Sequence, residues 1–358
     1  MDVVSQLSQD QEASVCEAFH CRAYQMRAQI FCGLGNYQGA VECLAVVERK
    51  CAHRWAAYDD RRWAFDVDRL LLLAGVNGRI GQTERALDIA KKAKAALSDH
   101  KDHEREAAVL HELGTSAWRM GEYRESLQYL TQSLAIHRSV DSLHMCGIVL
   151  LAYGDYEQAE TYFDEEPNEI GPEDPSRAFA LHQLGMVYTK TKELELAHEA
   201  ANEALAILKH PSRPFAESTK MLFSYGCIML ESGRMEKAEE AFAAVLRAAN
   251  LQFVGYPAVD TFGDVYHALG RLHVVRGDIK KATEYFNRAL AHRELWRGKE
   301  HPETADTLHE LGCLTTSATE AAELLGHAKR IRELKLCPGH PDTKRTADEL
   351  TSRMPRAQ

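Results

Sequence analysis

The chain has 358 residues, of which 45% are hydrophobic and 27% are charged, and its formal net charge at pH 7 is −10. This is the composition of an ordinary soluble protein, and the length is enough for a large core or a long repeat array. The negative charge argues against a general nucleic-acid binder and against a protein that binds anionic membranes.

The N-terminal sequence MDVVSQLSQDQEAS has neither a basic start nor an apolar run, so we expect no signal peptide and a disordered or frayed segment over residues 1–13. The longest apolar stretch, residues 70–76, is too short to span a bilayer. Nine cysteines, an odd number without a CxxC pair, indicate a reducing compartment. We therefore expect a cytoplasmic protein.

A helical hairpin pattern then recurs eight times along the chain. Its clearest copy is LHELGTSAWRMGEYRESLQYLTQSL at residues 110–134, in which apolar or small residues follow the i, i+3, i+4, i+7 spacing of one helix face. If Gly114 is called position 8, Gly121 falls at position 15, where the turn is expected. In chain order, position 8 holds Ala28, Ala74, Gly114, Gly147, Gly185, Gly226, Gly270 and Gly312.

Each recurring residue has a physical reason. A small residue at position 8 lets the two helices approach closely, and glycine at position 15 suits the left-handed residue that commonly ends a helix. Alanine at position 20, in seven of eight copies, is expected where the second helix meets the first. In the fifth copy Lys192 replaces the turn glycine, so we expect another turn conformation there. The eighth copy reaches its second helix about three residues early, so its first helix or turn must be shortened.

Acidic and proline-bearing segments separate some copies. The clearest expected loop is the sequence EEPNEIGPEDPS at residues 165–176, and further breaks are expected at 210–214 and 250–257. A helical hairpin of this size cannot bury its apolar face alone, so the copies must stack on one another.

The pattern resembles the tetratricopeptide repeat, a helix–turn–helix unit, and the resemblance covers residues 14–350. It implies an all-α fold, a right-handed α-solenoid of about eight repeats over residues 14–337, with a capping helix and tail over 338–358. The last copies look like the kinesin light chain subclass. Gly270 and Gly312 lie 42 residues apart, and the segments at 292–312 and 331–350 both carry a linker followed by His-Pro-x-Thr.

Motifs for catalysis are scarce. The sequence has no phosphate-binding glycine loop and no G-x-S-x-G motif, and the His-Glu pairs at His111 and His309 lack the second histidine of a zinc site. Cys16, His20 and Cys21 could suggest a metal, but their spacing does not place ligands on one helix face, so ordinary packing is the alternative. We predict no enzyme, no catalytic residue, no cofactor and no metal.

Histidine recurs at position 5 of the first helix in five of eight copies. In the tetratricopeptide family the first helices line the concave groove, so the resemblance implies that these imidazoles and their neighbours hold a peptide. The alternative is that histidine is merely tolerated at a half-exposed position. The candidate groove residues are His111, Thr115, Trp118, Arg119, His144, His182, Met186, Lys190, Phe223, His267, Arg271 and His309.

Two functions follow from the resemblance. The first is a protein–protein interaction scaffold or adaptor that binds a peptide or partner helix in the concave groove. The second is a peptide-responsive regulatory sensor, or the sensor arm of a larger signalling protein. Both predict a protein or peptide partner, and neither predicts contact with nucleic acid or membrane.

Overall fold

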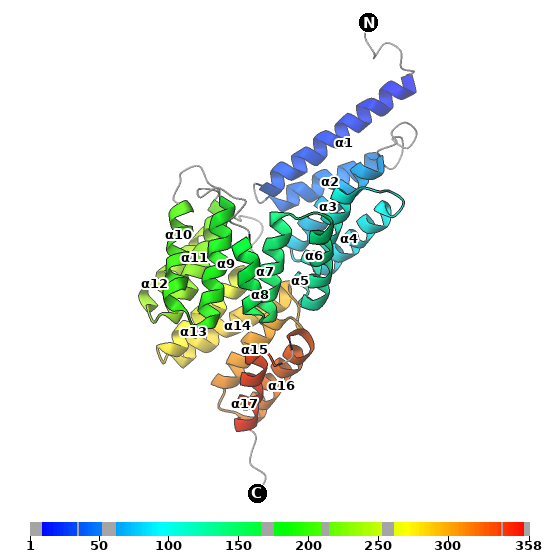
Figure 1. Cartoon of the computed structure of the whole chain (residues 1–358). Coiled ribbons are helices and arrows are strands. Elements are labelled where there is room, and N and C mark those ends of the chain that lie inside the picture. The colour runs from blue at the N-terminus through cyan, green and yellow to red at the C-terminus, as the bar shows by residue number, and fades with distance from the viewer. Residues whose placement is uncertain are drawn as a thin grey trace. The chain divides into compact units, whose positions relative to one another are not determined.

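The computed structural model describes residues 9–33, 36–51, 62–165, 175–208, 215–252, 261–337 and 339–353. These residues form seventeen helices and no strand (Figure 1). The helices are α1 (Gln9–Gly33), α2 (Tyr37–Cys51), α3 (Arg62–Arg79), α4 (Thr83–Leu97), α5 (His103–Arg119), α6 (Tyr123–Ile136), α7 (Val140–Tyr153), α8 (Tyr156–Glu165), α9 (Pro175–Thr191), α10 (Leu194–Leu208), α11 (Phe215–Glu231), α12 (Met235–Gln252), α13 (Thr261–Val275), α14 (Ile279–Trp296), α15 (Pro302–Leu314), α16 (Ala318–Lys335) and α17 (Pro341–Arg353).

The chain divides into two compact units. The first unit contains residues 1–116 and 132–137, and the second contains residues 117–131 and 138–358. In the first unit α1 packs on α2, α2 on α3, and α3 on α4. In the second unit α7 to α17 form a continuous series in which each helix packs against the next. The predicted all-α helical repeat is confirmed.

In three hairpins, a glycine of the first helix receives an aromatic ring of the second helix. A Cβ atom added to Gly147 would lie 2.4 Å from the ring of Phe163, and the corresponding distance from Gly226 to Phe242 is 2.5 Å. Gly270 and Phe286 repeat the arrangement at 2.6 Å. Any larger residue at position 8 would therefore push the ring out of place, since interiors are close-packed.

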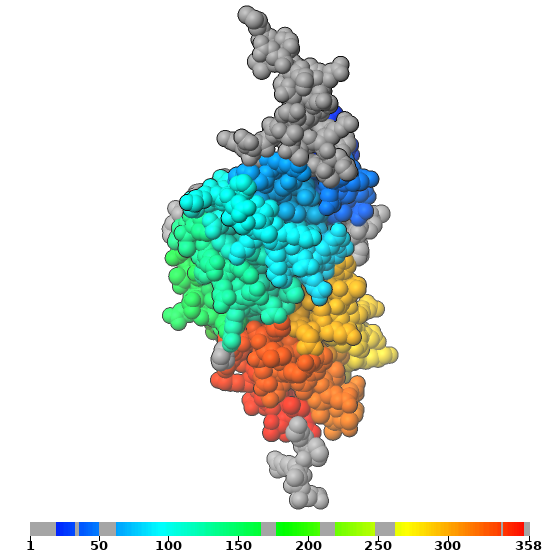
Figure 2. All heavy atoms as spheres, turned by 90° about the vertical axis from the view of Figure 1, so that its right-hand side faces the viewer, coloured from blue at the N-terminus to red at the C-terminus, as the bar shows by residue number. Residues whose placement is uncertain are grey.

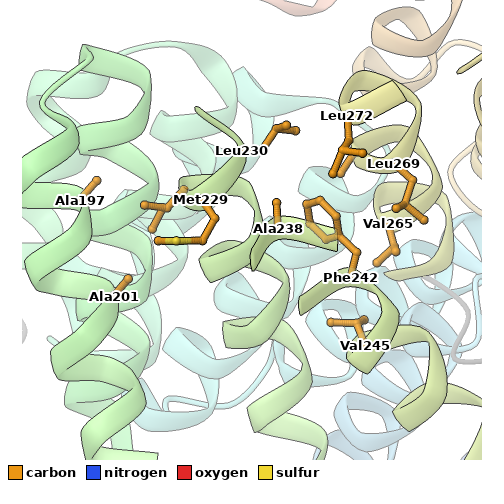
Figure 3. Close-up of a cluster of buried hydrophobic side chains, with 12 residues drawn as sticks. Ala197, Ala201, Met229, Leu230, Ala238, Phe242, Val245, Val265, Leu269 and Leu272 are labelled. Atoms are coloured by element: carbon orange, nitrogen blue, oxygen red, sulfur yellow. The ribbon is translucent and has the colours of Figure 1, made fainter. Parts of the chain in front are cut away.

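The same rings also join neighbouring hairpins. Phe242 of α12 is fully buried in a cluster with Val265, Leu269 and Leu272 of α13. Figure 3 shows its ring pointing from α12 towards the α13 side chains. Burial of one hairpin thus depends on the presence of the next, as expected for a stacked repeat.

The turns use left-handed residues, as predicted from the glycines. Gly121, Gly154, Gly233 and Gly277 have φ between 72° and 96°. The expectation that Lys192 would impose another conformation is wrong, because Lys192 itself has φ 71°. Lys192 therefore adopts the same left-handed conformation as the turn glycines of the other copies. This conformation costs an L-residue about 1–2 kcal/mol.

The eighth copy is shortened as predicted. Its first helix, α15, has 13 residues and ends at Leu314, and the three residues before α16 contain no left-handed residue. The other predicted boundaries stay predictions. Most of the expected loop at 165–176, the break at 210–214 and most of the break at 250–257 lie outside the described residues, as does the start of the segment 1–13. A helix, α17, occupies most of the predicted capping segment 338–358.

We predict that Lys192→Gly raises the free energy of unfolding by about 0.5–1 kcal/mol, because glycine relieves the left-handed strain while losing only an exposed ion pair. Urea unfolding followed by circular dichroism measures the change. Gly277→Ala, at the same turn position two copies later, is the matched control and should lose stability. A stabilising Gly277→Ala or a destabilising Lys192→Gly would contradict the assignment.

Candidate functional site

The first helices of successive repeats lie side by side in the second unit. Helix α7 contacts α9, α9 contacts α11, and α11 contacts α13. No two successive second helices, such as α10 and α12, make comparable contact within the described residues. The second unit is therefore curved, with its first helices on the inside. We call the surface formed by α9, α11, α13, α15 and α17 the inner face.

A row of charged side chains crosses the inner face. Glu231 of α11 accepts hydrogen bonds from Lys192 at 2.9 Å and from Arg271 of α13 at 2.5 Å. Further along, Arg345 of α17 donates to Glu310 of α15 at 3.3 Å. Each ion pair joins two different repeats, so the row couples the first helices that carry it.

The environment of these acids differs along the row. Burial would raise the pKa of Glu231, but Arg271 and Lys192 lower it overall. Burial dominates at Glu310 and raises its pKa, although Arg345 and Arg271 oppose the effect. Lys190 is exposed and has no hydrogen-bonding or ion-pair partner among the described residues. The inner face thus offers the Lys190 cation beside a mostly neutralised row.

The predicted histidines lie deeper than the row, where neighbouring first helices meet. His182 Nε2 lies 3.5 Å from Ser224 Oγ, and His309 Nδ1 lies 3.2 Å from Thr346 Oγ1. His267 Nδ1 lies 3.3 Å from Thr307 Oγ1 in the same way. His182 and His309 are buried, and His267 is half-buried. Each of these imidazoles therefore contacts a hydroxyl group of the next first helix and helps to join two repeats. Their contact with a ligand stays a prediction.

The other candidates are distributed unevenly. His144 packs between Phe163 and Phe179, with ring centroids 5.7 and 6.2 Å away, and Phe223 packs against Phe242. Lys190 and Arg271 are exposed, whereas the remaining candidates are half-buried or buried: His111, Thr115, Trp118, Arg119 and Met186. Their role as a peptide-binding set is also untested.

Three residues of the row were missed by the sequence reasoning, namely Glu231, Glu310 and Arg345. They fall at different repeat positions, because the row runs diagonally across the helices. A search for one repeat position could not find them. A search for opposite charges about 40 residues apart could have done so, since Glu231 and Arg271 are 40 residues apart and Glu310 and Arg345 are 35 apart.

Two buried arginines fix the last repeats. Arg293 donates to the Glu303 carbonyl at 2.6 Å and to Asp264 at 2.7 Å. Arg332, whose side chain is 0% exposed, donates equivalently to the Asp342 carbonyl at 2.9 Å and to Asp306 at 2.6 Å. Charge-assisted bonds to a carboxylate and a helix start are strong and directional, so they hold α15 and α17 in register with the preceding helices.

The His-Pro motifs of the sequence cap these same helices. His301 Nδ1 accepts a hydrogen bond from the Glu303 N–H at 3.2 Å, and His340 Nδ1 accepts one from the Asp342 N–H at 3.1 Å. Proline follows each histidine at the first helical position, where its missing N–H costs nothing. Both imidazoles must be neutral to accept, and burial lowers the pKa of each.

The two capped loops also pack on turns far away in the sequence but in the same unit. His301 and Pro302 contact Gly121, and His340 contacts Gly154. Lys335 forms an ion pair with Glu122 beside them. Figure 2 shows the orange and red C-terminal repeats side by side, next to the yellow helices of the same unit. We call this set of contacts the clasp; it joins repeats of the second unit that are far apart in the sequence, and so restricts the curvature of that unit.

Protonation of the buried histidines should weaken the fold in mild acid. Burial lowers the pKa of His182 from 6.5 to about 3. The contribution of neutral His182 to the free energy of unfolding is therefore complete above pH 6.5 and is lost as the pH falls towards 3. At pH 5 the loss amounts to about 2 kcal/mol. We predict that, between pH 7 and pH 5, the free energy of unfolding of the native chain falls by about 2 kcal/mol more than that of the His182→Gln variant. Urea titrations at the two pH values measure the difference. Equal losses in both proteins would contradict the burial of a neutral imidazole.

The clasp can be tested at its glycines. Gly154→Ala and Gly277→Ala both place an L-residue at positive φ, but only the former puts a Cβ 2.2 Å from an imidazole; nothing lies within 4 Å at Gly277. We predict that Gly154→Ala loses about 1–3 kcal/mol more than Gly277→Ala. It should also speed hydrogen exchange in α17. Identical behaviour of the two variants would show that the clasp is not formed.

No described helix combines the length and the apolar character needed to cross a membrane. Among the described side chains, no three histidine, cysteine or carboxylate groups gather as a metal site would require. The cysteines whose side chains are described are free thiols.

The chain is similar to several solved structures. It aligns with a Rap protein complexed with Competence and Sporulation Factor at 15% identity over 98% of this chain and 91% of that chain, with a TM-score of 0.62. It aligns with the APC/C hetero-tetramer Cut9–Hcn1 at 12% identity, over 93% of this chain and 55% of that chain, with a TM-score of 0.60. A tetratricopeptide repeat protein from Parabacteroides merdae is 14% identical, over 86% of this chain and 98% of that chain, with a TM-score of 0.50. At these identities the similarity supports the fold alone.

Family models give the assignment. Tetratricopeptide repeat models match residues 66–139, 261–333 and 111–175, which together span about half of the chain. No catalytic family is among these matches, and no curated protein matches the sequence. The resemblance of the last copies to kinesin light chain stays a prediction. The matched segments, the stacked helical hairpins and the glycine–aromatic contacts agree, and the chain belongs to the tetratricopeptide repeat family.

Proposed function

We propose that this chain is a protein–protein interaction scaffold that binds a peptide or a partner helix along the inner face of its second unit. Proteins of this fold are typically interaction scaffolds, and the fold supplies a preformed surface. A preformed surface lowers the ordering cost of binding, which then falls mainly on the ligand. In this proposal the chain acts without a cofactor and in the cytoplasm, and the free thiols are consistent with a reducing compartment.

The observation that carries the proposal is the row of polar side chains presented by successive first helices. Lys190, Arg271 and Arg345 retain N–H groups beyond those used in the ion pairs with Glu231 and Glu310. Such donors can bind the carbonyl groups of an extended peptide or its side chains. Because buried arginines and the clasp fix the helices, these donors keep a constant spacing.

A second candidate function is a peptide-responsive sensor. The similarity over 98% of this chain to a Rap protein solved with Competence and Sporulation Factor favours it. A sensor needs an element with two arrangements that the ligand distinguishes. In this second proposal the clasp is that element: it joins distant repeats through few contacts, and it opens or closes when the inner face is filled.

The proposal is tested by selecting peptides from a random library displayed against the full chain and measuring their affinities by calorimetry. We predict that the double variant Lys190→Gln, Arg271→Gln binds the selected peptides at least tenfold more weakly, about 1.4 kcal/mol. The matched control is Lys237→Gln, Lys280→Gln, which removes two exposed lysines from the second helices α12 and α14.

Two results would contradict the proposal. One is a library that yields no peptide with saturable binding. The other is equal weakening in both double variants, which would indicate a general charge effect instead of an inner-face site. For the sensor, hydrogen exchange in α17 should change when a selected peptide is added, whereas a simple scaffold leaves it unchanged.

A further inference from the structure

In the internal copies, one face of the first helix is buried. Positions 3 and 10 define this face, since they lie seven residues apart on one side of a helix. At position 10, the side chains from the second to the seventh copy are no more than 1% exposed: Val76, Ser116, Val149, Val187, Ile228 and Leu272. At position 3, from the third to the eighth copy, they are no more than 2% exposed: Val109, Ser142, Ala180, Met221, Val265 and Thr307.

In two copies, buried clusters identify the groups of the preceding second helix that cover this face. Val76 of α3 belongs to a cluster with Ala40 and Leu44 of α2. Ile228 of α11 belongs to one with Ala197 and Ala201 of α10. In both cases the second helix offers an alanine at position 20 and an apolar residue four positions later. The stack therefore uses one recurring helix–helix interface.

Helix α1 exposes the same face. Ile30 at position 10 is 61% exposed, Met26 at position 6 is 63% exposed, and Phe19 one turn before position 3 is 74% exposed. Ala23 at position 3 is exposed as well. The opposite side of α1 is buried normally, by Cys21, Gln25 and Ala28. These four exposed residues, Phe19, Ala23, Met26 and Ile30, are called the α1 face below.

Such a face is unusual at the end of a stack, because terminal repeats normally carry a polar outer surface. Exposed apolar residues aligned on one helix side mark an interaction site. We propose that the α1 face binds an amphipathic helix of a partner protein, which takes the position that a preceding second helix takes in every internal copy. This site is separate from the inner face and does not depend on the function proposed for it.

The interface already used inside the stack specifies the partner helix. It should carry alanine and, four residues later, another small or apolar residue, so that it can seat Ile30 and Ala23 as α2 seats Val76. Charge specifies its edges. Among the described side chains of α1, Arg22 and Arg27 are charged and none is acidic. A helix with carboxylates beside its alanine stripe would therefore be complementary.

The other occupants fit less well. The undescribed ranges inside this chain contain at most ten residues, whereas α2, which fills the equivalent position on α3, has 15. A second copy of α1 would bring Arg22 and Arg27 of both chains together, and like charges placed side by side are unfavourable. A partner helix of acidic character avoids both difficulties.

The chain supplies its own probe for this site. The sequence of α10, LELAHEAANEALAIL, carries Ala197, Ala201 and Ala204 on one side and three glutamates, with no lysine or arginine. Its own seat between α9 and α11 is already filled, so a synthetic copy can bind only at an open seat. A fluorescein-labelled peptide of this sequence is titrated with the full chain, and anisotropy is measured.

We expect saturable binding that Met26→Glu, Ile30→Glu weakens at least tenfold. The matched control, Leu295→Glu, Leu334→Glu, replaces two other exposed apolar residues, 73% and 67% exposed, and should leave binding unchanged. Circular dichroism must show the same helix content in all three proteins, which is expected because the replaced side chains are exposed.

A second arm covers weak binding of a short helix. The α10 sequence is joined ahead of residue 1 through a flexible linker, which raises its effective concentration to about the millimolar range. We expect a higher thermal midpoint than with a scrambled sequence, and no gain in the Met26→Glu, Ile30→Glu background. Absence of binding together with absence of this gain would overturn the proposal. So would sedimentation showing a dimer that Met26→Glu, Ile30→Glu dissociates, since a second copy would then be the occupant.

Discussion

The close approach of two helices at position 8 is the constraint on which the rest of the structure depends. In three copies a glycine receives a phenylalanine ring at a distance that no Cβ could tolerate. The ring then reaches past its own hairpin into the next first helix, as Phe242 does with Leu269 and Leu272. One contact thus sets both the geometry of a hairpin and its position on its neighbour, which is why the repeats cannot fold independently.

Polar contacts make this stack specific. The histidine–hydroxyl contacts and the buried arginines all cross from one repeat to the next. A buried polar group tolerates little displacement, because an unsatisfied donor or acceptor is costly. These contacts therefore hold the first helices in one register, and the clasp fixes the curvature of the second unit. The exposed donors of the inner face inherit that fixed spacing.

The repeat and its fold were predictable from sequence because they rest on local rules. A glycine at position 8, such as Gly226, indicates a close approach of two helices, and a glycine at position 15, such as Gly233, indicates a turn. Periodic apolar residues indicate the buried faces. Lys192 was misjudged because tertiary packing of α9 and α10 imposes the left-handed turn regardless of residue type. The row of Glu231, Arg271, Glu310 and Arg345 was found only in part, since it runs across repeats and not along a repeat position. The clasp could not be predicted either, because Gly154 and His340 are 186 residues apart and meet only through the accumulated rotation of the stack.

The most direct test of the central contact is the sign of one substitution. Gly226→Ala would ordinarily stabilise a helix by up to about 1 kcal/mol, as is expected for Gly326→Ala in α16, where nothing lies within 4 Å of the added Cβ. Because Phe242 occupies that space at Gly226, the account predicts that Gly226→Ala lowers the free energy of unfolding, and that Phe242→Leu relieves part of this loss in a double-mutant cycle. A stabilising Gly226→Ala, or strictly additive effects of the two substitutions, would contradict it.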